Sequence, residues 1–112
     1  MAADLLLAKG YAIIARNWRI PQAEIDIVAG KEGYCVFVEV RSRTDVDHGH
    51  PLETIRRQKQ AQIIRAARLY IGMEGPSATA FRFDVIAVTF DKEDQTIPPE
   101  IIHIENAFQT DL

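Results

Sequence analysis

Two apolar runs in the first half of the chain have the pattern of neighbouring β-strands. The first contains Ile25, Ile27 and Val28, and the second covers residues 35–40, which read CVFVEV. Both runs are rich in β-branched or aromatic side chains and are bounded by glycines, as is typical of strands joined by a tight turn. We therefore predict a β-hairpin over Ala23–Arg43.

The turn of this hairpin decides which residues face each other across it. A two-residue turn at 32–33 places Lys31 opposite Tyr34. The same register places Asp26 directly opposite Glu39, provided that the loop has an even number of residues. Directly opposed side chains in an antiparallel pair have Cβ atoms about 4.5–5.5 Å apart. The sequence thus predicts two carboxylates close together on a half-buried sheet.

Two like charges that face each other in this way destabilise a sheet unless a positive charge lies between them. A divalent cation is one solution, and Mg²⁺ prefers carboxylate oxygens and retains several waters where the protein supplies few ligands. An ordinary ion pair is the other solution, in which Arg41 or Arg43 neutralises Glu39. The spacing alone favours neither alternative.

Further along the chain, the apolar residues change to a helical period. They recur at intervals of three and four residues, and Pro51 suits the first turn of a helix over Pro51–Ile71. The apolar stripe consists of Leu52, Ile55, Ile63, Ala66, Ala67, Tyr70 and Ile71. Lys59 is the one charge on this stripe, and a buried amine is costly unless it is paired. Lys59 either points toward the carboxylates or lays its stem on the core with its amine in water.

The remaining patterns predict the other elements of the fold. A short helix is expected over Ala2–Lys9, a strand over Tyr11–Ile20, another over Thr79–Phe90, and a last short strand or edge segment over Glu100–Phe108. With the hairpin and the long helix, this order predicts an α+β fold with a mixed sheet, formed by a single domain over residues 1–112.

Three further side chains on the strands have predicted roles, and that of Trp18 has two alternatives. Trp18 lies between arginines in the sequence RNWR at residues 16–19. It either stacks on a nucleic-acid base, while the arginines contact phosphates, or packs on the core with the arginines in water. Cys35, the one cysteine, is expected to be a small core residue. Asp84 is expected to pair with Arg82 in a structural role.

Composition and charge narrow the class of protein. The chain has 112 residues, 47% of them hydrophobic, and a formal net charge of −3, which argues against a generally basic nucleic-acid binder. No apolar run is long enough to span a bilayer and no signal-peptide pattern is present, so we expect a cytoplasmic protein with no membrane partner.

The distribution of charge is more informative than its total. The segment Pro51–Ile71 carries five basic residues and one acidic residue, whereas Thr89–Leu112 carries six acidic residues and one lysine. A localised basic surface fits contact with a polyanion, although a basic helix is also an ordinary solvated face. The candidate nucleic-acid-binding residues are Arg43, Arg56, Arg57, Lys59 and Arg65. The polar segment Thr44–His50 is expected to be a loop bordering the site.

Several segments together resemble a known family. They are GYAIIARNWR, EID, VFVEVRSR, RFDVIAV and IIHIENAF. The chain resembles the YraN-like family of bacterial proteins, which has the restriction-endonuclease-like fold of the PD-(D/E)xK nuclease superfamily. The resemblance covers most of the chain. It implies a restriction-endonuclease-like core, a mixed sheet flanked by helices, in which Asp26 and Glu39 bind Mg²⁺ or Mn²⁺.

The chain departs from the family pattern at three places. Arg41 stands where the superfamily has a lysine that positions or activates water, and a guanidinium stays protonated, so it cannot serve as a general base. Ala23 stands where the family usually has glycine. Relatives also carry a glutamate about one turn before the position of Ala2, so we expect a truncated first helix or the loss of that ligand.

These observations predict a metal-dependent nuclease-like protein that hydrolyses phosphodiester bonds, with DNA expected rather than RNA. Asp26, Glu39 and the carbonyl of Val40 would hold Mg²⁺ or Mn²⁺, and Arg41 and Lys59 would stabilise the charge of the transition state. The first alternative is a non-catalytic nucleic-acid-binding module on the same fold. The second is a structural or protein-interaction domain. Cleavage of two strands would favour a homodimer.

Overall fold

The computed structural model of the protein describes residues 1–44 and 55–110. Within them the elements are α1 (Ala2–Ala8), β1 (Ala12–Ile20), β2 (Ala23–Lys31), β3 (Tyr34–Thr44), α2 (Arg57–Glu74), β4 (Ala80–Phe90) and β5 (Glu100–Phe108). The strands form one sheet in the order of the sequence. The β3–β4 pair is parallel and the other neighbours are antiparallel. The predicted α+β fold with a mixed sheet is therefore confirmed, and it is consistent with a restriction-endonuclease-like core.

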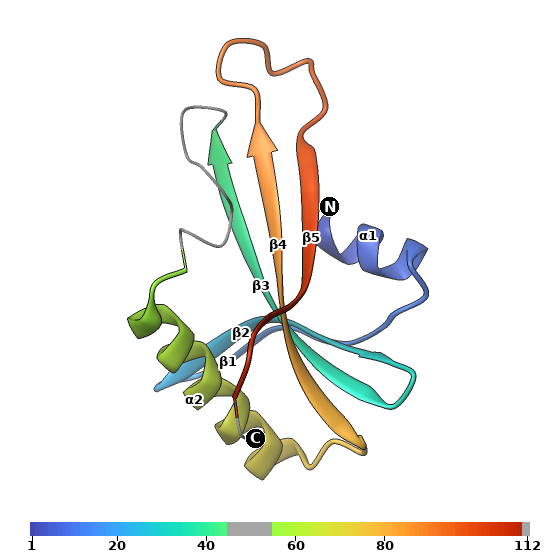
Figure 1. The fold of residues 1–112 in the computed structure, drawn as a ribbon, viewed down its shortest axis with the longest axis vertical. Coiled ribbons are helices and arrows are strands. Elements are labelled where there is room, and N and C mark those ends of the chain that lie inside the picture. Colours follow the sequence, from blue (N-terminus) through green and yellow to red (C-terminus); the bar gives the residue numbers. More distant parts are fainter. Residues whose placement is uncertain (45–54, 111–112) are drawn as a thin grey trace.

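The two helices cover opposite faces of the sheet (Figure 1). On the α2 face, Ile63, Ala66 and Tyr70 pack on buried residues of β2, β3 and β4. On the α1 face, Ala2 and Leu6 pack on a second cluster from the same strands. Because α2 also connects the two parallel strands β3 and β4, it forms the crossover that parallel pairing requires.

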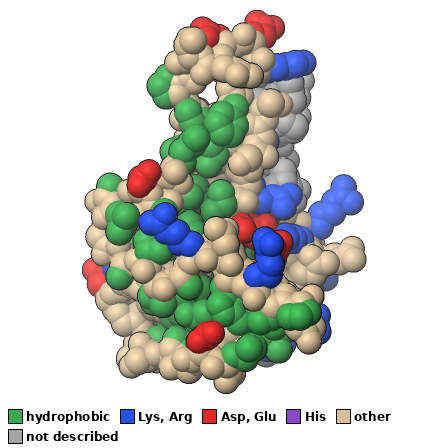
Figure 2. Space-filling model, turned by 180° about the vertical axis from the view of Figure 1, so that it is seen from behind, with side chains coloured by type: hydrophobic (Ala, Val, Ile, Leu, Met, Phe, Trp, Pro, Cys, Tyr) green, Lys and Arg blue, Asp and Glu red, His purple; other side chains and the backbone are tan. Residues whose placement is uncertain are grey.

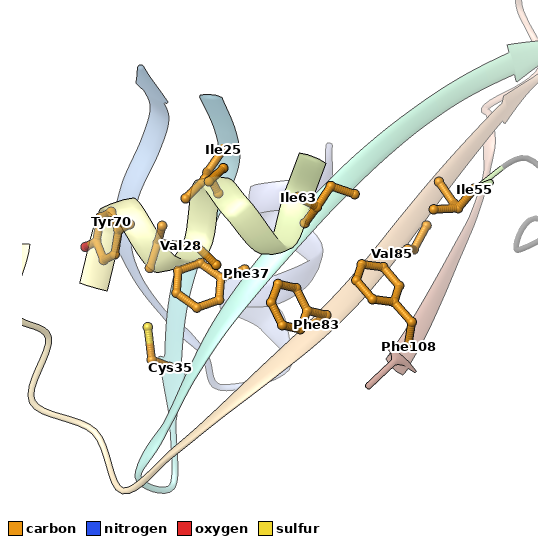
Figure 3. Packing of buried hydrophobic residues seen from close by; sticks show 12 residues of the cluster. Ile25, Val28, Cys35, Phe37, Ile55, Ile63, Tyr70, Phe83, Val85 and Phe108 are labelled. Carbon is orange, nitrogen blue, oxygen red and sulfur yellow. The ribbon is translucent and has the colours of Figure 1, made fainter. Parts of the chain in front are cut away.

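Aromatic rings fill the centre of the α2 face. Phe37 lies between Tyr70 and Phe83, with ring centroids 5.8 and 5.6 Å away (Figure 3). Phe83 stacks in turn on Phe108 of β5 at 5.0 Å. Offset and edge-on arrangements at such distances add to the energy of burial. This cluster fixes α2 over β3, the strand that carries Glu39.

The hairpin turn has the predicted register. Glu32 and Gly33 both have positive φ, 52° and 85°, as in the type I′ turn that matches the twist of the flanking strands. Lys31 pairs with Tyr34, and the register continues from there to Ile27 and Val38. The turn is therefore the predicted two-residue turn, and it sets the alignment of both strands.

The ladder between β2 and β3 ends one pair before the two carboxylates. Beyond Ile27–Val38, β2 remains paired with β1 as far as Ala23, and β3 remains paired with β4 as far as Thr44. The two halves of the sheet therefore diverge, as Figure 1 shows. We call this place, formed by Asp26, Glu39 and Val40, the strand split.

The long helix begins later than the apolar stripe predicts. α2 starts at Arg57, because Arg56 is an extended N-cap residue with φ −72° and ψ 162°. Ile55 is buried in the α2-face core but precedes the helix. The predicted apolar stripe therefore included a residue that packs on the same face of the sheet without being helical. Gly75 ends the helix in the left-handed conformation. The predictions for 45–54 lie outside the described residues.

The packing decides the interpretation of Trp18 that the sequence left open, and it confirms two expectations. Trp18 packs edge-on against Tyr70 at 5.3 Å and its indole N–H donates to Glu74, so it belongs to the core rather than to a stacking surface. Cys35 is buried, as expected. Arg82 pairs with Asp84 at 2.8 Å, also as expected. Neither helix of the described part is long and apolar enough to cross a membrane.

We expect Gly33→Ala to destabilise the protein by about 1–2 kcal/mol, since an L residue in this left-handed conformation is strained. A Cβ there would also lie 2.8 Å from Thr79 Oγ1. Urea unfolding measures the change. The matched control is Gly72→Ala in α2, where a Cβ meets nothing within 4 Å and should stabilise the helix by about 0.5–1 kcal/mol. Equal effects of the two substitutions would contradict the role of the turn.

Candidate functional site

Asp26 is fixed within the strand split by a bond to the opposite strand. Its Oδ2 atom accepts a hydrogen bond from the backbone N–H of Val40 at 2.8 Å. A side-chain carboxylate thus takes the place of the β2 carbonyl that would otherwise continue the ladder. Because a backbone N–H in a partly buried position needs an acceptor, the split is stable only while the side chain at position 26 supplies one.

The regular alternation of side chains breaks at Asp26. Ile25 and Val28 both pack in the α2-face cluster, whereas Ile27 packs in the α1-face cluster. On β1, the pairing with β2 skips Asn17, which has a φ of 50°. Simple alternation, which assigns every second residue to one face, therefore does not place Asp26 correctly.

Glu39 lies on β3 with its side chain only 12% exposed and with two basic neighbours. Its Oε2 atom is 3.5 Å from Lys59 Nζ and 3.5 Å from Arg41 Nη1. Lys59 thus points from α2 toward the carboxylate, which is the first of the two orientations considered for it. Arg41 also pairs with Glu39, as the ion-pair alternative expects, but this pairing occurs beside a second carboxylate.

The pKa of Glu39 is raised above its ordinary value. Burial is the largest cause and the negative charge of Asp26 is the next, and together they outweigh the opposing effects of Lys59 and Arg41. The effect of Asp26 places the two carboxylates within electrostatic reach of each other. The surroundings of Glu39 therefore disfavour its ionised form and would be improved by additional positive charge.

Asp26 has a different environment. Within residues 1–44 and 55–110, no basic side chain lies within ion-pairing distance of its carboxylate. Its one hydrogen bond there comes from the Val40 N–H. Of the two carboxylates, Glu39 thus has two basic neighbours, whereas Asp26 has none among the described residues.

These residues fit a hard divalent cation. Asp26 and Glu39 offer carboxylate oxygens, and the backbone of Val40, which contacts Asp26, would add a carbonyl oxygen. Among the described residues, no group of three or more His, Cys, Asp or Glu could hold a metal ion. Such a sparse set of oxygen ligands suits Mg²⁺ or Mn²⁺, which retain water ligands, and does not suit zinc.

Two grooves that share Lys59 and Gln62 run along the N-terminal half of α2. The first is lined by Arg41, Arg56, Gln58, Lys59 and Gln62. The second is lined by Arg19, Ile20, Pro21, Gln22, Ala23, Glu24, Lys59, Gln62, Ile63 and Arg65. Basic side chains also surround a small acidic patch on the face shown in Figure 2.

The structure brings only some of the predicted nucleic-acid-binding residues to these grooves. Arg56, Lys59 and Arg65 line them. Arg57 is exposed but lines neither groove. Arg43 lies farther along β3 and donates a hydrogen bond to Thr89 on β4.

The sequence was compared with models of known protein families. A family model described as "Uncharacterised protein family UPF0102" matches residues 1–88. The chain belongs to the UPF0102 family. This confirms the YraN-like resemblance, since UPF0102 is the YraN-like family. The matched residues include every candidate site residue of the UPF0102 chain, from Asp26 to Arg65.

UPF0102 relatives come from diverse bacteria. The chain is 49% identical to a UPF0102 protein of Prosthecochloris aestuarii over 87 residues, which cover 78% of this chain and 68% of the relative. It is 44% identical over 111 residues to one from Chlorobaculum parvum, covering 96% and 85%. It is 41% identical over 101 residues to one from Moorella thermoacetica, covering 90% and 84%.

A buried polar network on the α1 face was not anticipated from the sequence of this UPF0102 chain. Asp84, 1% exposed, accepts hydrogen bonds from Arg82, from His103 Nε2 at 2.7 Å and from the backbone N–H of Asn106. Burial alone would raise the pKa of Asp84, but the bonds from His103 and Arg82 lower it. His103 Nδ1 accepts from Lys9 Nζ at 2.6 Å. The only signal in the sequence was the Arg82–Asp84 spacing.

We expect Glu39→Gln to raise the Tm at neutral pH. The folded-state pKa of Glu39 lies above its ordinary value, so its ionised form destabilises the fold once the pH exceeds the unfolded-state pKa. The gain should fade as the pH falls below the ordinary carboxyl range, where Glu39 is protonated in both states. Calorimetry across pH measures it. The control is Glu24→Gln, an exposed glutamate paired with Arg19, which should change the Tm little.

Proposed function

We propose that this UPF0102 protein is a divalent-metal-dependent nuclease that hydrolyses phosphodiester bonds of nucleic acid. The observation that carries the proposal is the meeting of two carboxylates, Asp26 and Glu39, at the strand split beside Lys59. The pKa of Glu39 is raised despite its two basic neighbours. Asp26 has no basic partner among the described residues. An added cation between two such carboxylates would favour the ionised form of both.

The residues at and beside the strand split would have different roles in hydrolysis. Asp26, Glu39 and the carbonyl of Val40 would hold Mg²⁺ or Mn²⁺. When bound, the cation would supply a water of lowered pKa and would neutralise phosphate charge. Once Glu39 has a stronger cationic partner, the Lys59 amine and the Arg41 guanidinium are available to the phosphate oxygens, where negative charge develops in hydrolysis.

Arg41 has a limited role in this scheme. A guanidinium remains protonated at ordinary pH, so Arg41 cannot remove a proton from water. Its planar donors can still bind phosphate oxygens in pairs. Arg41 would therefore orient and neutralise the phosphate, and it would not take the proton of the attacking water.

Asp26→Asn should abolish Mn²⁺-dependent cleavage of branched, flapped or single-stranded DNA, by more than about 100-fold. The amide oxygen can still accept the Val40 N–H, so the fold and its Tm should be retained, unlike in Asp26→Ala. Calorimetric titration should show Mn²⁺ binding by the unaltered protein and none by Asp26→Asn.

The control for this experiment is Asp4→Asn, which alters an exposed aspartate on α1 and should retain both cleavage and Mn²⁺ binding. Cleavage that persisted in Asp26→Asn would assign the activity to another site. Absence of Mn²⁺ binding by the unaltered protein would favour the structural or protein-interaction alternative.

A second candidate function is a nucleic-acid-binding module without catalysis. It is favoured by one observation, that Arg41 occupies the superfamily lysine position and contacts Glu39 at 3.5 Å. Lys59 contacts the same carboxylate oxygen. In this alternative the grooves along α2 bind the phosphate backbone, and metal-dependent cleavage is absent while salt-sensitive binding is retained.

Paired substitutions along α2 test the contribution of the grooves in both candidates. Replacing Arg56 and Arg65 by alanine should weaken DNA binding and reduce the slope of log affinity against log salt by about 2, about one unit for each lost phosphate contact. The matched control replaces Arg57 and Arg68, which carry the same charge on the same segment but line neither groove. Equal losses would indicate a general charge effect instead.

A further inference from the structure

The strand split also opens onto a cavity away from α2. This cavity is lined by Arg16, Asn17, Asp26, Ile27 and Val40, with no described residue of α2 on its wall. Ile27 belongs to the α1-face cluster, whereas Lys59 and Arg41 line a groove beside α2. Asp26 therefore lines this cavity, whereas Arg41 and Lys59, which contact Glu39, line the groove beside α2.

Asn17 has an unusual conformation at the rim of the cavity. Arg16 pairs with Ile27 and Trp18 pairs with Ile25, so Asn17 and Asp26 occupy opposite positions that the ladder skips. Asn17 has a φ of 50°, a left-handed conformation that asparagine tolerates better than most residues. Backbone outliers of this kind concentrate at functional sites. Here the outlier lies directly across from a candidate metal ligand.

Arg16 presents an uncompensated positive charge beside the same cavity. Its side chain is exposed, and no hydrogen bond or ion pair joins that side chain to another residue of the described part. The next arginine on β1, Arg19, instead pairs with Glu24 at 3.1 Å. One cavity thus contains a carboxylate without a cationic partner and borders a guanidinium without an anionic partner. If a phosphate group were bound there together with a divalent cation, the cation would pair with the Asp26 carboxylate and the phosphate with the Arg16 guanidinium.

We propose that Arg16 and Asn17 form a phosphate-binding subsite that holds the substrate backbone on the side of the strand split opposite Lys59. This inference rests on the proposed nuclease function and adds to it a second set of substrate contacts. A guanidinium binds phosphate through two parallel hydrogen bonds, and the Asn17 amide is a further donor at the rim.

The subsite contacts the backbone of the nucleic acid rather than its bases. None of the residues lining the cavity is aromatic, and the nearby Trp18 is held by Tyr70 and Glu74. Binding without base stacking relies on phosphate contacts. The substrate class is therefore a nucleic-acid backbone recognised without regard to sequence.

The test measures binding of a fluorescein-labelled DNA oligonucleotide by anisotropy in EDTA, so that cleavage does not interfere. Arg16→Ala should weaken binding about tenfold or more, and Arg16→Lys should restore only part of it, because an ammonium lacks the paired donors. Asn17→Gly removes the amide but keeps the left-handed backbone, since glycine adopts it freely, and should weaken binding less. The control is Arg68→Ala, which lines none of these cavities.

Kinetics with Mn²⁺ separate this role from a structural one. Arg16→Ala should raise KM while leaving kcat and the Tm close to those of the unaltered protein. If Arg16→Ala binds the oligonucleotide as Arg68→Ala does, the subsite is wrong and the proposed nuclease can still stand. If Arg16→Ala lowers the Tm and Arg16→Lys restores it, the residue is structural. If the unaltered protein neither binds nor cleaves DNA, the nuclease proposal fails together with the subsite.

Discussion

The hydrogen bond from the Val40 N–H to Asp26 is the contact on which the arrangement of the site depends. It allows β2 and β3 to separate without leaving a backbone donor unpaired, and so lets each strand follow its other neighbour. The same bond fixes a negative charge between the two halves of the sheet. An apolar side chain of similar size could fill the gap but would leave the Val40 N–H without an acceptor.

The electrostatics of the site follow from that placement. Glu39 is brought under α2, where Lys59 and Arg41 reach it, while Asp26 remains directed toward the gap. Burial amplifies the repulsion between the two carboxylates because fewer waters screen it. The core around Phe37 and Tyr70 holds α2 in position, so the packing of the helix and the charge balance of the site are coupled.

Local sequence predicted those features that depend on local interactions. The register of the hairpin follows from the turn at Glu32 and Gly33 and from the spacing of the residues around it, and β5 begins and ends where its pattern indicates. The start of α2 was missed because Ile55 packs with the helix without belonging to it. The break at Asp26 and the bonds of His103 join residues far apart in sequence, and no period within one segment encodes such contacts.

The contact between Lys9 and His103 joins residues 94 positions apart. Lys9 is the C-cap of α1, and its backbone carbonyl also accepts a hydrogen bond from Lys31, so the end of this helix is tied both to the hairpin and to β5. Helix α1 is thus fastened in part by a residue that is synthesised 94 positions later. During synthesis, α1 cannot reach its final attachment until His103 has left the exit tunnel, and the α1 face of the sheet stays incompletely sealed until then.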